Sequence, residues 1–161
     1  MNYPKYIFNS SSDSVDFTFK SVGGKGEIEK AIRYELVNEE HNIYNLCFGE
    51  IKGYNEGTGK LEIDDKVESK NGDMEMILAT VASSAYLFNE TYPERIIYFS
   101  GSTDSRTRLY RMAISKEYDE ISKKFDIFGA VFEDNVLRTV PFNNNGYFNG
   151  FIIKSKQNEK S

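Results

Sequence analysis

One stretch of the chain combines an apolar run, a turn of small residues and a helical pattern that begins with basic residues. Arg95–Ser100 (RIIYFS) predicts a strand, and Gly101–Asp104 (GSTD) predicts a tight turn into the following helix. Backbone N–H groups in such a turn point along the helix axis and favour anions. Ser102 and Thr103 add hydroxyl donors, and Arg106 adds a two-pronged guanidinium. The pattern predicts a binding site for a phosphate or a carboxylate.

Three arginines follow this turn and need not share one role. At 100° per residue, Arg106 falls near the middle of the apolar face, whereas Arg108 and Arg111 point to solvent. An arginine in the first helical turn is disfavoured by the helix dipole, so Arg106 needs a negative partner. That partner is either a bound anion or Asp65, which faces the core if the alternating Leu61, Ile63 and Val67 do. A solvated Arg106 is the third alternative.

A second motif has the residue types of a metal-dependent nuclease. Asp64-Asp65-Lys66 fits a D-x-K pattern, in which carboxylates hold Mg²⁺ and the lysine stabilises charge on the scissile phosphate. Glu50, near the end of the preceding strand, is the candidate upstream carboxylate. Mg²⁺ is a cofactor only if this alternative holds. Otherwise the cofactor is unknown, and no metal is expected, since a single Cys47 and a single His41 are too few for the usual zinc sites.

Charge and composition limit the partners. The chain has 161 residues, with 25 acidic against 20 basic side chains and a net charge of −5, so it has no general basic surface for nucleic acid or membranes. Arg106, Arg108 and Arg111 still give one helix a cationic face. The chain has no apolar stretch as long as a membrane span and no signal-peptide pattern, so we expect a cytoplasmic protein without a membrane partner. The sequence does not set an oligomeric state.

The first half of the chain alternates in the manner of strands. Twelve Phe and 11 Tyr favour β-rich structure, and Tyr6–Val67 predicts four antiparallel strands, with Gly49–Gly59 as an unstructured glycine-rich connection. After Asn71-Gly72-Asp73, apolar residues from Met74 to Phe88 predict a helix that Tyr92-Pro93 ends.

The second half places the arginine helix between strands. That helix is expected to reach about Lys124, and three strands then form a meander: Phe125–Phe132, Val136–Phe142 and Tyr147–Lys154. The predicted fold is therefore a single α+β domain, residues 1–154. Its largely antiparallel sheet has four N-terminal strands and three or four C-terminal strands, and it packs against two helices. Residues 155–161 are expected to form a polar tail.

Several strings resemble one family when taken together. They are Asn45–Gly49 (NLCFG), Ile63–Lys66 (IDDK), Asn71–Asp73 (NGD), Leu78–Val81 (LATV) and above all Gly101–Ile114 (GSTDSRTRLYRMAI). The chain resembles, over about residues 6–128, an uncharacterised family of small proteins found mainly in Bacteroidota and known only as a domain of unknown function. It departs from that family in the glycine-rich insertion and in the variable carboxyl end. The resemblance implies no catalytic residue, but it implies that these strings form one site.

Three functions follow from these residues. The first is binding of a phosphate-bearing ligand, a nucleotide or a nucleic acid, at Gly101–Arg106, with Arg108, Arg111 and Asp65 contributing. The second is a Mg²⁺-dependent nuclease or phosphotransfer enzyme that uses Glu50, Asp64 and Lys66. The third is a non-catalytic interaction module, of a toxin–antitoxin or phage-related kind, whose arginine helix docks an acidic protein.

Overall fold

The protein combines nine strands and three helices in the described residues. The computed structural model describes residues 4–66 and 70–157, so Val67 of the predicted strand lies outside this part. Most of the paired strands are antiparallel, which confirms a mixed fold with a largely antiparallel sheet. The chain divides into two compact units: the amino unit, Asn2–Tyr34 and Cys47–Phe88, and the carboxyl unit, Glu35–Leu46 and Asn89–Ser161. A single domain over residues 1–154 stays a prediction.

Five strands contribute to the amino unit, one more than predicted. The first three pair antiparallel in chain order, and the last two pair with each other. Their bounds are β1 (Asn9–Ser10), β2 (Asp16–Gly23), β3 (Gly26–Asn38), β4 (Ile43–Asn55) and β5 (Lys60–Asp64).

The glycine-rich segment is not an unstructured connection. β4 continues to Asn55, and only a four-residue turn separates it from β5. Gly49 makes this pairing possible, because a Cβ there would lie 2.1 Å from the carbonyl oxygen of Asp64. Gly53 lies at a register shift that follows Ile51. Glycine in this segment therefore permits close strand approach and a bulge rather than breaking the strand.

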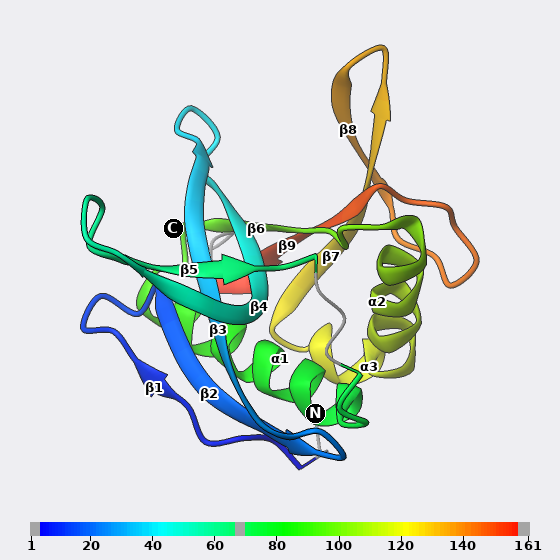
Figure 1. The fold of residues 1–161 in the computed structure, drawn as a ribbon. Coiled ribbons are helices and arrows are strands. Elements are labelled where there is room, and N and C mark those ends of the chain that lie inside the picture. The colour runs from blue at the N-terminus through cyan, green and yellow to red at the C-terminus, as the bar shows by residue number, and fades with distance from the viewer. Residues whose placement is uncertain (1–3, 67–69, 158–161) are drawn as a thin grey trace. The chain divides into compact units, whose positions relative to one another are not determined.

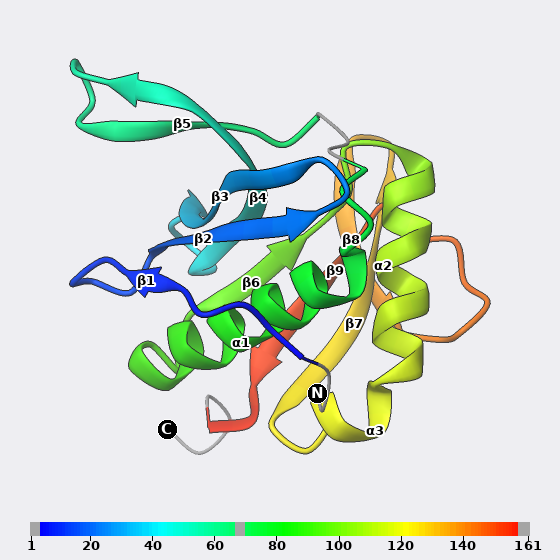
Figure 2. The same ribbon diagram turned by 60° about the horizontal axis from the view of Figure 1, so that its bottom comes forward.

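The predicted first helix is confirmed and covers a face of the amino unit's strands. α1 (Met74–Thr91) lies along β2 in Figure 2. Tyr34 of β3 stacks on Phe88 of α1 with ring centroids 4.1 Å apart, and its hydroxyl lies 2.8 Å from that of Ser84. Phe17 and Ile32 are fully buried in the same core. Aromatic side chains therefore hold this helix on the strands.

The residues before α1 are fixed by hydrogen bonds. Asp73 accepts hydrogen bonds from the hydroxyls of Ser21 and Tyr6, each at 2.5 Å. The buried Asn71 donates to the hydroxyl of Ser21 and to the carbonyl of Gly26, both at 3.0 Å. The Asn-Gly-Asp string therefore ties the start of α1 to β2 and to the β2–β3 turn.

In the carboxyl unit the strands do not form the predicted meander. The remaining strands are β6 (Ile96–Phe99), β7 (Phe125–Glu133), β8 (Val136–Pro141) and β9 (Gly150–Ser155). β9 pairs with β7 and β6 rather than with β8, and the first residues of β4 pair parallel to β6. The β7–β8 hairpin extends beyond β9 (Figure 1). A long connection from β8 allows β9 to return to the other side of β7, which a meander of tight turns excludes.

The second predicted helix is two helices. α2 (Asp104–Lys116) has Glu117 as its C-cap, and α3 (Tyr118–Ile121) follows and ends before Lys124. Tyr110 of α2 stacks on Phe99 of β6 at 4.5 Å, so α2 packs on the strands of its own unit.

The carboxyl-terminal residues begin as structure rather than as a tail. Ser155 is buried and ends β9, and the backbone N–H of Lys156 donates to the carbonyl of Lys124. Residues 158–161 of the predicted tail lie outside the described part. In the described ranges, no helix combines the length and the apolar character needed to cross a membrane.

Candidate functional site

The turn before α2 uses several of its polar groups to hold itself together. Thr103 is the N-cap residue, and its hydroxyl accepts a hydrogen bond from the backbone N–H of Arg106 at 3.2 Å. The backbone N–H of Gly101 donates to the hydroxyl of Thr107 at 3.0 Å. The hydroxyl of Ser102 accepts from the Arg106 guanidinium at 3.1 Å. These residues therefore shape the turn and fold Arg106 back over it.

The buried face of α2 agrees in part with the apolar face that its spacing predicts, which comprises Leu109, Tyr110, Ala113, Ile114 and Ile121. Thr107, Tyr110 and Ile114 are buried, whereas Leu109 is 37% exposed. These three buried residues at spacings of three and four lie one above another on a helix, and Leu109 falls to one side of them. Arg106 is half-buried.

The other two arginines line a cavity on the flank of α2. Arg108 is exposed, and Arg111 is half-buried with one guanidinium N–H donating to the carbonyl of Gly146 at 2.8 Å. The cavity, called the α2 cavity below, has a volume of about 250 Å³. Its wall on α2 also includes Asp104, Ser105 and Thr107, and the opposite wall is Gly146–Phe148 with Phe151.

The loop between β8 and β9 forms that opposite wall. The orange segment of Figures 1 and 2 lies beside α2 in both views. Phe148 anchors the loop: it is 7% exposed, and its ring lies 5.8 Å from that of Phe142 and 5.9 Å from that of Phe151. Tyr147, the neighbouring residue, is 68% exposed. The buried phenylalanine therefore presents the tyrosine at the rim of the α2 cavity.

Electrostatics and one unsatisfied donor favour an anion in this cavity. Two arginines outnumber the single carboxylate of Asp104 among the lining residues. The Nε–H of Arg111 is buried and has no hydrogen-bond partner. A buried donor without an acceptor costs about 1–3 kcal/mol, and this donor belongs to a residue that lines the cavity. The arrangement is suited to hold a phosphate or a carboxylate beside an aromatic ring.

Asp65 lies in the other unit. Asp65 is exposed rather than directed inward. β5 ends at Asp64, so the alternation of inward and outward side chains does not extend to Asp65. Its pairing with Arg106, and its part in one site with Gly101–Arg106, stay predictions.

The candidate catalytic residues are all in the amino unit, and two of them meet across a strand pair. Glu50 and Asp64 are direct partners in the β4–β5 register. Glu50 also lies 3.8 Å from the ammonium of Lys52, and Asp64 accepts from the backbone N–H of Lys66 at 3.0 Å. Within residues 4–66 and 70–157, no three His, Cys, Asp or Glu side chains gather in a way that could hold a metal ion.

Sequence reasoning missed the loop wall of the α2 cavity. The sequence pattern predicts Gly146 in a turn and Tyr147 and Phe148 in the last strand of a meander, and nothing near α2 in the sequence points to them. The available signal is the Asn143–Gly146 run (NNNG), which is typical of a loop and is followed by two aromatic residues.

The fold and the site define a small mixed α/β protein with a basic, aromatic-rimmed cavity beside one helix. Comparison with family models gives a match over residues 2–156 to a family of unknown function, DUF6934. The chain belongs to this family, which confirms the expectation of an uncharacterised family, and a Bacteroidota origin stays a prediction. No curated protein and no solved structure matches the chain.

Proposed function

We propose that this protein binds a phosphate-bearing ligand, a nucleotide or a nucleic acid, in the α2 cavity. One observation carries the proposal: Arg108, Arg111 and the exposed Tyr147 line the same cavity of about 250 Å³. This position is the flank of the first turns of α2, which adjoins the predicted Gly101–Arg106 turn. The turn's hydroxyls accept hydrogen bonds from Arg106 and keep their own O–H donors for an anion.

Each lining residue has a distinct role in the proposal. Arg108 meets the phosphate from the solvent side, where its guanidinium offers paired donors that match phosphate oxygens. Arg111 is fixed by Gly146, and its buried Nε–H supplies the second donor. Tyr147 offers an aromatic face for a base, and stacking of this kind contributes about 1–3 kcal/mol.

The acidic balance of the chain favours a small ligand for the first test. A net charge of −5 repels a long polyanion, whereas a mononucleotide meets only the local field of the two arginines. Adenosine 5′-monophosphate is therefore a suitable probe, since it combines one phosphate with one base.

Isothermal titration of adenosine 5′-monophosphate into the protein and into Arg108→Gln tests the proposal. Loss of one charged hydrogen bond, about 1.5–3 kcal/mol, weakens binding by about ten- to a hundredfold. Arg138→Gln is the matched control, because it removes one exposed arginine of β8 that pairs with Glu133 at 2.6 Å, away from the cavity. Equal affinity in the two variants, or no binding at millimolar concentration, contradicts the proposal.

A Mg²⁺-dependent nuclease or phosphotransfer activity is the second candidate. Its support is the β4–β5 register, which sets Glu50 opposite Asp64, with Lys66 two residues further on. Binding of Mg²⁺ or Mn²⁺ to the folded state raises the melting temperature by mass action. No shift at millimolar metal, or the same shift in Glu50→Gln, removes this candidate.

A further inference from the structure

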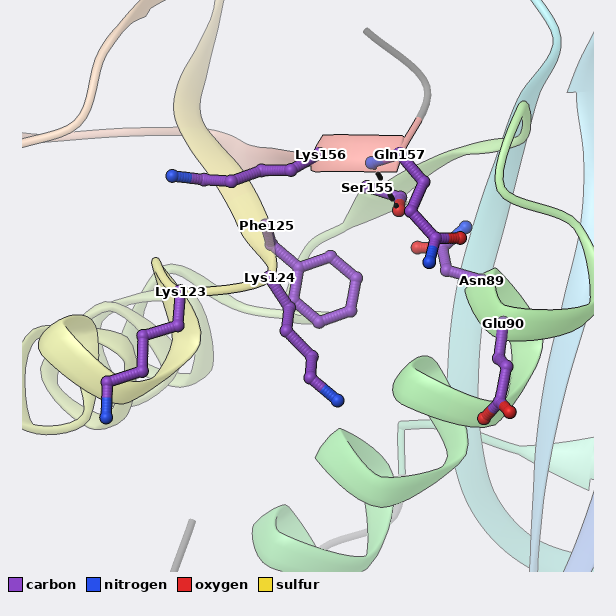
Figure 3. Close-up of a pocket in the computed structure, with 8 residues that line it drawn as sticks. All are labelled: Asn89, Glu90, Lys123, Lys124, Phe125, Ser155, Lys156 and Gln157. Atoms are coloured by element: carbon purple, nitrogen blue, oxygen red, sulfur yellow. Dashed lines mark hydrogen bonds between the residues drawn. The ribbon is translucent and has the colours of Figure 1, made fainter. Parts of the chain in front are cut away.

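A second cavity of the carboxyl unit lies where the end of α1 meets the end of β9 and the start of β7. Its volume is about 380 Å³, and it shares no lining residue with the α2 cavity. Asn89 and Glu90 line it from α1, and Lys123 and Lys124 from the segment between α3 and β7. Lys156 follows β9. Figure 3 shows the two residues of α1 on one side and the lysines on the other.

Asn89 points to a ligand at this cavity, which we call the α1 cavity. Asn89 is 2% exposed, and its Nδ2 donates to the carbonyls of Tyr92 at 3.2 Å and Arg95 at 2.9 Å. These two bonds fix the orientation of the amide, so its oxygen cannot exchange places with its nitrogen. The oxygen Oδ1 is buried and has no hydrogen-bond partner. Figure 3 shows the Asn89 amide directed toward the side of Ser155 and Gln157. A residue of this wall therefore holds a buried, unsatisfied acceptor.

The opposite side of the α1 cavity is cationic. The ammonium groups of Lys123 and Lys156 lie near carboxylates, Glu120 at 3.1 Å and Asp126 at 3.8 Å. The Lys123–Glu120 pair is exposed, so it contributes little to stability and is released readily, whereas Asp126 is half-buried. In Figure 3, Lys123 and Lys156 diverge, and Lys124 extends into the space between them and Glu90. A four-carbon stem lets each ammonium follow an anion.

We propose that the α1 cavity binds a small zwitterion. Its ammonium donates to Asn89 Oδ1 and meets Glu90, and its anionic group, a phosphate or a carboxylate, meets the lysines. Because acceptors lie on one side of the cavity and cations on the other, the ligand needs an ammonium and an anionic group in one molecule. This requirement distinguishes it from the ligand of the α2 cavity, which combines a phosphate with a base.

Isothermal titration with O-phosphoethanolamine tests the proposal. It should bind at least tenfold more tightly than methyl phosphate or ethanolamine, each of which supplies one end only. γ-Aminobutyrate carries a carboxylate in place of the phosphate. If it binds more tightly than O-phosphoethanolamine, the anionic group of the ligand is a carboxylate. The proposal is overturned if both zwitterions bind no more tightly than methyl phosphate and ethanolamine.

Variants separate the α1 cavity from the rest of the protein. Lys123→Gln/Lys156→Gln and Glu90→Gln change polar side chains outside the core, two of them exposed and Lys156 half-buried, so the fold is retained. Each should weaken zwitterion binding severalfold or more. Lys60→Gln, an exposed lysine of β5, is the charge-matched control. Arg108→Gln should have no effect, which keeps the outcome independent of the α2 cavity. Binding that survives both α1-cavity variants overturns the proposal.

Discussion

Replacing Gly101 by alanine tests how the turn approaches α2. The φ angle of Gly101 is not in the left-handed region, so the cost of a side chain there is purely steric. An added Cβ would lie 2.5 Å from the backbone nitrogen of Thr107 and 2.8 Å from the backbone carbon of Arg106. Ordinary contact starts at 3.4 Å, so the first distance is short by 0.9 Å. The clashing atoms belong to the helix backbone, so relieving the clash requires the helix or the turn to shift.

The magnitude follows from two costs. Overpacking of this kind costs about 1–3 kcal/mol, and displacement of the turn also breaks the bond from Gly101 to the Thr107 hydroxyl, about 1 kcal/mol. The sum, about 2–4 kcal/mol, lowers the melting temperature by roughly 5–15 °C in a protein of this size.

Thermal unfolding followed by circular dichroism measures this effect. Gly24→Ala is the matched control, since a Cβ at Gly24 meets nothing within 4 Å and its φ is not in the left-handed region. The control should melt within about 2 °C of the parent, because exposed substitutions stay near ±0.5 kcal/mol. If Gly101→Ala melts with the control, the turn shifts freely and the close approach is not a constraint on the site.

Three further substitutions have defined outcomes. Burial raises the pKa of Tyr34 above its ordinary value of 10.0. The neutral hydroxyl therefore contributes stability that is present below about pH 10 and is lost as the pH rises. Alkaline unfolding should begin at higher pH in Tyr34→Phe, and equal pH midpoints for the two proteins would refute this. Gly129→Ala places a Cβ 2.3 Å from the ring of Phe148; displacing that anchor should increase solvent access to the Tyr147 loop, measured by hydrogen exchange, and unchanged exchange would contradict the anchoring role. Gly49→Ala places a Cβ 2.1 Å from the carbonyl oxygen of Asp64. It should separate β5 from β4 and lower the free energy of unfolding in urea by about 1–3 kcal/mol. An unchanged midpoint would show that the strands do not need this close approach.

Local patterns predicted those elements that local physics decides. The apolar spacing from Met74 to Phe88 identified α1, and the Arg95–Ser100 run identified β6. The N-cap role of Thr103 was not predicted, because its hydroxyl was assigned to an anion instead. The glycine-rich segment was misread because the value of Gly49 lies in the approach of another strand, which the local sequence does not contain.

Strand pairing and the second wall of the α2 cavity depend on distant residues. β9 crosses to the far side of β7, although the turns between these strands resemble those of a meander. Arg111 appeared solvent-facing on a helical projection, but its partner is the carbonyl of Gly146, 35 residues further along the chain. Such a contact depends on the tertiary path of the loop, so only the arginines and not the aromatic wall could be predicted.

The most direct test of the central claim is a nuclear magnetic resonance titration of the isotope-labelled protein with adenosine 5′-monophosphate. The account predicts saturable shifts of the backbone amides of Ser105–Arg108 and Tyr147, which flank the α2 cavity. The amides of the β8 hairpin around Arg138 should stay unchanged. Shifts confined to residues outside the α2 cavity, or no saturable shift at millimolar ligand, would contradict phosphate-ligand binding at α2.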